Sequence, residues 1–135
     1  MRIVEILLNS FWPLCKAALK YTIPLTIVSF GCGTVLAFIT AIFRLSGVRI
    51  LQGIAKFYIW IIRGTPLMLQ LVIIFYGPGK WFDFNLWGYF SDGRMAACVI
   101  AFVINYACYF AVIYRGGIES VPVGQQEAGQ VLGMT

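Results

Sequence analysis

The sequence predicts an all-α integral membrane protein with three transmembrane helices, an N-terminal interfacial segment and a short cytoplasmic helix near the C-terminus. Apolar residues make up 61% of the 135-residue chain, charged residues make up 11%, and the mean hydropathy is +0.87. Soluble domains carry about 25% charged residues. The net charge of +5 comes from scattered single residues. This pattern predicts anchoring at lipid headgroups and contact with the lipid bilayer, and no nucleic-acid binding.

Two uncharged runs predict the first and third transmembrane helices, over residues 21–43 and 95–114. At a rise of ~1.5 Å per residue these helices are about 34 and 30 Å long, enough to cross a ~30 Å hydrocarbon core. Their backbone must be helical because lipid offers no hydrogen-bond partners. Upstream, Glu5, Asn9 and Pro13 interrupt an apolar patch that lacks a signal-peptide cleavage site, so we expect an interfacial segment there.

The second transmembrane helix is predicted over residues 51–77. The sequence Gly77-Pro78-Gly79 indicates a sharp end. A helix starting at Gly64 would be only about 20 Å long, so the helix must begin near Leu51. Lys56, Tyr58 and Trp60 are then expected as interface anchors. Pro66 removes the hydrogen bond to the carbonyl of Ile62 and bends this helix.

Polar residues within this helix and the third one are candidates for a translocation pathway. Gln70 follows Arg63 by seven residues, which places both on one face and favours an interior orientation. The alternative for Arg63 is an anchor whose side chain reaches the headgroups. Thr65 is expected to bond its own backbone or a neighbouring helix, and Asn105 to bond another helix at about 0.6 kcal/mol. The pathway candidates are Arg63, Thr65, Pro66, Gln70 and Asn105.

The segment 80–90 is dense in aromatic residues. It predicts a short interfacial helix or a re-entrant loop, with contact to an external partner as the alternative. The four cysteines form no CxxC pair and the chain has no histidine, so no metal site is expected.

Charge favours one orientation only weakly. Residues 44–63 contain four basic residues and no acid, which indicates a cytoplasmic loop, and residues 115–135 share that side. Each side then has five positive charges, so only the acid-free loop favours an external N-terminus.

The tail predicts a short helix that needs a partner. The third helix is expected to end at Arg115-Gly116-Gly117. A helix over 125–132 follows, with Gly124 as N-cap, Glu127 as its third residue and Gly133 closing it. Because a helix of about eight residues is marginal in water, we expect its apolar stripe to enter a partner's groove. A membrane-surface helix is the alternative. The stripe consists of Ala128, Val131 and Leu132.

Two long motifs resemble a known family. The sequence Ile62-Arg63-Gly64-Thr65-Pro66-Leu67, followed by Gln70 and Phe75-Tyr76-Gly77, resembles the signature of permease subunits of ATP-binding-cassette (ABC) importers for polar amino acids. The sequence from Arg115 to Pro122, with Gly124-Gln125, is similar to that group as well. Glu127-Ala128-Gly129 and Gly133 resemble the "EAA" loop of importers, and the resemblance extends from about Trp12 to Thr135.

The resemblance implies a bacterial inner-membrane permease with five transmembrane helices and an external N-terminus. Its partners would be a cytoplasmic ATPase subunit, a second permease subunit in a homo- or heterodimer, and an extracytoplasmic solute-binding protein. ATP and Mg would be used by the ATPase, so this chain would bind no cofactor and would be no enzyme. The EAA loop would form a cytoplasmic coupling helix on the ATPase, through Gly124, Gln125, Glu127, Ala128, Val131, Leu132 and Gly133.

The sequence departs from the family pattern at two places. Gly129 stands where alanine is usual, which lowers helix propensity by ~1 kcal/mol. The family's next two helices do not follow Thr135, so the 135-residue chain alone is not expected to transport. The alternative function is therefore a non-transporting membrane interaction module that binds the ATPase or a partner permease.

Overall fold

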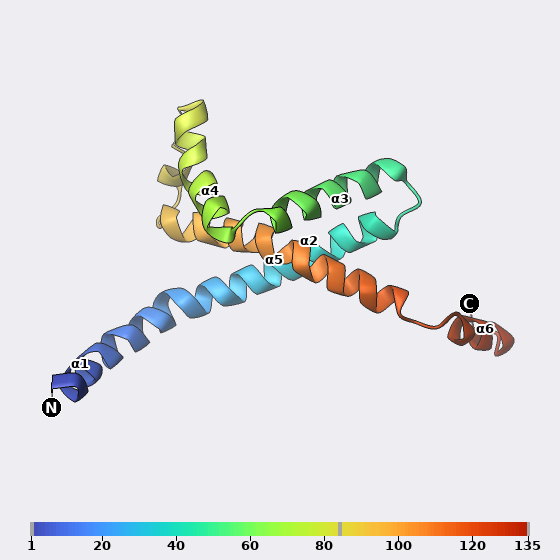
Figure 1. Ribbon diagram of the computed structural model, residues 1–135, viewed down its shortest axis with the longest axis horizontal. Helices are drawn as coiled ribbons and strands as arrows, with labels where there is room; N and C mark the ends of the chain where they lie inside the picture. Colours follow the sequence, from blue (N-terminus) through green and yellow to red (C-terminus); the bar gives the residue numbers. More distant parts are fainter. Residues whose placement is uncertain (1, 84, 135) are drawn as a thin grey trace.

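The protein is an arrangement of helices around a long crossed pair (Figure 1). The computed structural model describes residues 2–83 and 85–134, and every regular element within them is helical. Two helices are long and apolar enough to cross a membrane, or three if one bent pair counts as a single span. In chain order the elements are α1 (Arg2–Ala17), the π-helix η1 (Ala18–Thr22), α2 (Ile23–Leu45), α3 (Arg49–Gly64), α4 (Leu67–Phe82), the 3₁₀-helix η2 (Leu86–Tyr89), α5 (Gly93–Glu119) and α6 (Val123–Val131).

The N-terminal half begins with one continuous rod, α1–η1–α2, rather than a separate interfacial segment followed by a helix over 21–43 (Figure 1). Residues Val4–Leu45 together meet the length and hydropathy of a membrane span. Within the rod the Ile23 N–H donates to the Ala18 carbonyl, which is the wider π spacing. Pro24 follows at once, and its ring would crowd an ordinary α turn. The π turn therefore lets the helix continue past this proline.

Small residues bring α2 and α5 together. On α2 the buried residues Ser29, Gly33, Ala37 and Ala41 recur every four positions. A Cβ on Gly33 would lie 3.8 Å from the Val103 carbonyl oxygen, so the two backbones approach closely there. Lipid is as apolar as leucine, so membrane helices associate through such close packing. The buried apolar residues of α5 are also small: Ala97, Ala101, Ala107, Cys108 and Ala111.

The predicted helix over 51–77 is instead two helices. α3 ends at Gly64, α4 begins at Leu67, and the chain bends by 105° between the two helices. Both Thr65 and Pro66 are extended, with ψ of 139° and 142°. A proline disfavours the α region at the residue before it, and the extended Thr65 and Pro66 separate the end of one helix from the start of the next.

The helix ends predicted at two glycine-rich sequences are also wrong. α4 continues through Gly77, Pro78 and Gly79 to Phe82, and α5 continues through Gly116 and Gly117 to Glu119, rather than ending at Tyr114. Glycine permits a left-handed turn without imposing one. Among the described glycines, only Gly133 has positive φ. The end of α5 is followed closely by Pro122, which disfavours helix at the residue before it.

The aromatic segment 80–90 splits into the last turn of α4 and η2; Phe84 lies outside the described residues. The ring of Trp87 on η2 stacks on Phe75 of α4, with centroids 6.1 Å apart. Its Nε1–H also donates to the Phe75 carbonyl at 2.7 Å. The segment thus folds back on α4, and its contact with an external partner stays a prediction.

We expect Ala37→Leu to destabilise the fold by about 1–3 kcal/mol, because Ala37 is fully buried between α2 and α5 and a larger side chain would overpack the contact. Denaturation by sodium dodecyl sulfate (SDS) in mixed micelles, followed by tryptophan fluorescence, measures the change. Val35→Leu is the control, since Val35 is 61% exposed on the same helix. Equal stability of the two variants would contradict the close packing.

Candidate translocation junction and coupling helix

The break between α3 and α4 frees backbone groups that the chain itself satisfies. Pro66 has no N–H, so the Ile62 carbonyl loses its helical donor, as the sequence predicts. The Gln70 side chain replaces it. Its Nε2 donates to the Ile62 carbonyl at 2.9 Å and to the Thr65 carbonyl and hydroxyl at 3.1 and 2.8 Å. One side-chain amide in the first turn of α4 thus donates to the acceptors at the end of α3.

The same amide joins α4 to α5. Gln70 Oε1 accepts a hydrogen bond from Asn105 Nδ2 at 3.0 Å, and both side chains are only 6% exposed. The expected interhelical bond of Asn105 is therefore confirmed. Asn105 lies near the middle of the uncharged run 95–114, so the junction lies at half the depth of that run. Thr65 also behaves as expected, since its hydroxyl lies 3.0 Å from the carbonyl of Ile61 in its own helix.

Arg63 and Gln70 do not share a helix face, because the helix breaks between them. The prediction from their seven-residue spacing is wrong. Arg63 is exposed, and its guanidinium carbon lies 5.3 Å from the centroid of the Tyr109 ring. Both side chains nevertheless reach α5 one turn apart, at Asn105 and Tyr109. No carboxylate among the described residues pairs with Arg63. A guanidinium stacked in this way can still bind a carboxylate with two hydrogen bonds.

Tyr58 has a role that the sequence does not predict. The sequence indicates an interface anchor, yet Tyr58 is half-buried and its hydroxyl donates to the Ile104 carbonyl of α5. This bond ties α3 to α5 just beside Asn105. A tyrosine in an apolar helix predicts both roles equally well, so only the tertiary packing distinguishes them.

The C-terminal helix α6 starts earlier than predicted. Pro122, rather than Gly124, is the N-cap, and the Gln125 N–H donates to the Pro122 carbonyl at 3.0 Å. Glu127 is therefore the fifth helical residue instead of the third, which weakens its interaction with the helix dipole. Gly124 and Gln125 lie in the first turn.

Gly133 closes α6, as the sequence predicts. Its φ is +73°, its N–H donates to the Gln130 carbonyl at 3.0 Å, and the Met134 N–H donates to the Gly129 carbonyl at 3.0 Å. This pair of bonds is the Schellman motif, in which glycine adopts a left-handed conformation after the last helical turn. The end of the helix is thus fixed by local backbone bonds.

The apolar stripe of α6 is exposed. Val131 and Leu132 are 87% and 78% exposed, and Ala128 and Glu127 are also classed as exposed. α6 stands apart from the other helices at the C-terminal end of α5 (Figure 1). The seven residues predicted to bind an ATPase therefore gather on one isolated helix and its closing turn.

We expect Gln70→Ala and Asn105→Ala each to destabilise the fold by about 1–3 kcal/mol, because each leaves a buried amide unpaired. The double variant should lose less than the sum, with a coupling energy of about 0.6–1.7 kcal/mol. SDS titration of the four proteins measures this cycle. Gln126→Ala, which removes an exposed amide, is the control. Strict additivity would mean that the two side chains do not interact.

Comparison with known proteins gives consistent results. The family model described as "Binding-protein-dependent transport system inner membrane component" matches residues 33–135. The L-cystine transport system permease protein TcyB of Bacillus subtilis is 45% identical over 131 residues, covering 97% of this chain and 53% of the relative. The nopaline transport system permease protein NocM of Agrobacterium fabrum is 36% identical over 136 residues, covering 98% and 56%.

A solved structure, titled "Crystal structure of an amino acid ABC transporter with histidines", is similar with a TM-score of 0.78 and 34% identity. The match covers 95% of this chain and 56% of that one. The chain thus spans about half the length of its relatives. These relatives are transport permeases rather than enzymes. On the family match over residues 33–135, the chain belongs to the family of binding-protein-dependent transport system inner membrane components.

Proposed function

We propose that the chain forms part of the translocation pathway of an ATP-driven amino-acid uptake system and docks the cytoplasmic ATPase subunit through residues 123–133. The observation that supports this most directly is the exposed stripe of α6, immediately after a long apolar helix. An ATPase of this kind would hydrolyse ATP with Mg, and the permease would bind neither. This function places the protein in a bacterial inner membrane, with residues 115–135 in the cytoplasm and the N-terminus outside.

Docking suits the physical properties of α6. A helix of nine residues has little stability of its own, so it needs a surface to order it. Val131 and Leu132 offer an apolar contact for a groove, and Glu127 offers a charge beside it. The helix contains no lysine or arginine, which argues against the alternative of a membrane-surface helix. The same properties would also serve a non-transporting interaction module, so uptake distinguishes the two functions.

The pathway role belongs to the junction between α3, α4 and α5. Transporters commonly place broken helices at the middle of the membrane, where the freed backbone groups line a cavity. In this conformation Gln70 and Asn105 bond each other and are buried, whereas Arg63 is exposed. We therefore assign Arg63 to direct contact with solute, and Gln70, Asn105, Thr65 and Pro66 to holding the break. A second permease subunit and an extracytoplasmic binding protein would complete the pathway.

Glu127→Lys should lower the amount of ATPase that co-purifies with the intact permease about tenfold, because a reversed charge at a docked surface opposes association. Quantitative pull-down from detergent-solubilised membranes measures this loss. Glu5→Lys makes the same chemical change on the exposed N-terminal part of α1 and should leave the ATPase bound. Unchanged co-purification of the Glu127 variant would remove this residue from the interface.

Gln70→Ala in the intact transporter, reconstituted with its ATPase and binding protein, should lower amino-acid uptake about tenfold while expression falls less than twofold. Without its amide, the Thr65 carbonyl loses its donor, the Ile62 carbonyl keeps only the longer bonds from Thr65, and the break loses its geometry. Radiolabelled uptake into proteoliposomes, normalised to the amount of protein, gives the ratio. Normal uptake kinetics would restrict Gln70 to packing. Absence of uptake in the wild type with all partners present would favour the interaction module.

A further inference from the structure

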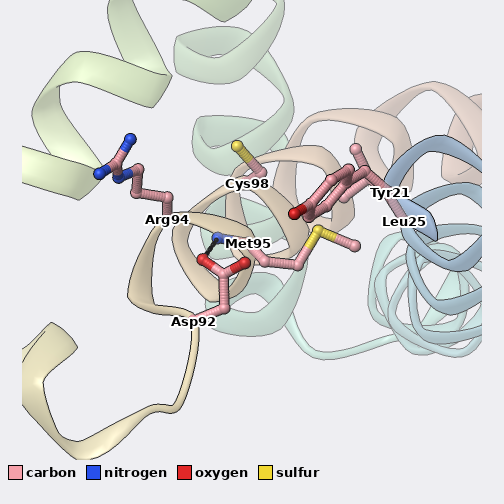
Figure 2. Close-up of a pocket in the computed structure, with 6 residues that line it drawn as sticks. All are labelled: Tyr21, Leu25, Asp92, Arg94, Met95 and Cys98. Carbon is pink, nitrogen blue, oxygen red and sulfur yellow. Dashed lines mark hydrogen bonds between the residues drawn. The ribbon is translucent and has the colours of Figure 1, made fainter. Parts of the chain in front are cut away.

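A cavity of about 530 Å³ lies where η1 and the start of α2 meet the start of α5 (Figure 2). We call it the headgroup cup; it is lined by Tyr21, Leu25, Asp92, Arg94, Met95 and Cys98. Asp92 is the N-cap of α5 and Arg94 is its second residue, just before the apolar run 95–114. Leu25 and Met95 belong to the uncharged runs themselves. The cup is thus charged at one end and apolar at the other.

Neither Asp92 nor Arg94, the two charged residues of the cup, forms an ion pair with another described residue. One Asp92 oxygen accepts the Met95 N–H at 3.2 Å, as the N-cap of α5. Figure 2 shows the Arg94 side chain directed away from that carboxylate, toward the neighbouring helix. Lys20 is not among the lining residues, and its Nζ lies 5.2 Å from the centroid of the Tyr21 ring. A ligand that has an ammonium and an anionic group would satisfy both signs.

An apolar groove continues from the cup. It has a volume of about 350 Å³, shares Leu25 with the cup, and extends between α2 and α5. Along α5 the lining advances from Met95 in the cup to Phe110 in the groove, which is about 22 Å of helix. This length exceeds the thickness of one leaflet of the hydrocarbon core, which is ~15 Å. The aromatic lining of the groove consists of Phe30, Phe102, Tyr106 and Phe110.

We propose that the cup and groove together bind one phospholipid with a primary ammonium in its headgroup, of the phosphatidylethanolamine class. The ammonium would donate to Asp92, the phosphate would accept from Arg94, and an acyl chain would lie in the groove. A free amino acid has a similar pair of charges but no apolar chain for the groove. Phosphatidylglycerol has the phosphate and the chains but lacks the ammonium. Comparison with a free amino acid therefore tests the groove, and comparison with phosphatidylglycerol tests the ammonium contact.

Native mass spectrometry of the full chain in detergent, titrated with the two lipids bearing identical acyl chains, measures the binding. Phosphatidylethanolamine should bind about tenfold more tightly than phosphatidylglycerol, as expected for one charge-assisted hydrogen bond. Asp92→Asn should abolish that preference, because asparagine still caps α5 but has no charge. Arg94→Gln should weaken both lipids to a similar extent. Asp83→Asn, an exposed acid outside the cup, is the matched control and should change neither affinity.

Four outcomes would overturn the proposal. Equal affinity of the wild type for the two lipids would mean that Asp92 binds no ammonium. A preference that survives in Asp92→Asn would place the recognition elsewhere. Displacement of the lipid by excess free serine, or equally tight binding of chainless glycerophosphoethanolamine, would assign the cup to a small zwitterion and exclude the groove.

Discussion

Every backbone polar group within a bilayer must find a partner inside the protein, and this constraint governs the α3–α4 break. Pro66 removes one donor and favours the extended conformation that Thr65 adopts. The side-chain amide of Gln70 then donates to three acceptors at the end of α3, of which the Ile62 carbonyl also accepts longer bonds from Thr65. Since the other end of this amide accepts from Asn105, the break is also fixed against α5. Loss of this single side chain would leave the junction with unpaired groups on both sides.

The crossed pair α2–α5 supplies the surface on which the junction is built. Its small residues allow the two backbones to approach, as Gly33 and Val103 show. Larger side chains fill the edges of the contact, where Phe30 and Phe110 meet edge to face at 5.6 Å. The same pairing also creates the groove along one side of the crossed pair. Small residues at the centre of the α2–α5 contact and aromatic residues at its edge thus produce both the close packing that supports the junction and the apolar groove.

The sequence predicted the parts of this arrangement that depend on local chemistry. Gly133 as the helix end, the freed Ile62 carbonyl, the Thr65 backbone bond and the Asn105 interhelical bond all follow from what those residue types can do. The failures have one cause. Gly77, Gly116 and Gly117 permit a helix end without requiring one, and Pro66 permits either a bend or a break. Local pattern leaves such choices open, and contacts with distant residues decide them: Gln70 reaches back across the break, and Tyr58 reaches α5.

Under the proposed function, α5 connects docking with the pathway. Asn105 lies fourteen residues before Glu119, about 21 Å along one unbroken helix, and α6 follows four residues later. A push on α6 would therefore reach the Gln70–Asn105 bond as a tilt of α5. Gly116 and Gly117 lie near the end of this helix, where each glycine is less favourable than alanine by roughly 0.5–1 kcal/mol, and the Arg115–Glu119 pair spans both positions. Under the proposed function, bending at these two glycines would absorb part of a motion of α6, and the remainder would reach the junction through α5.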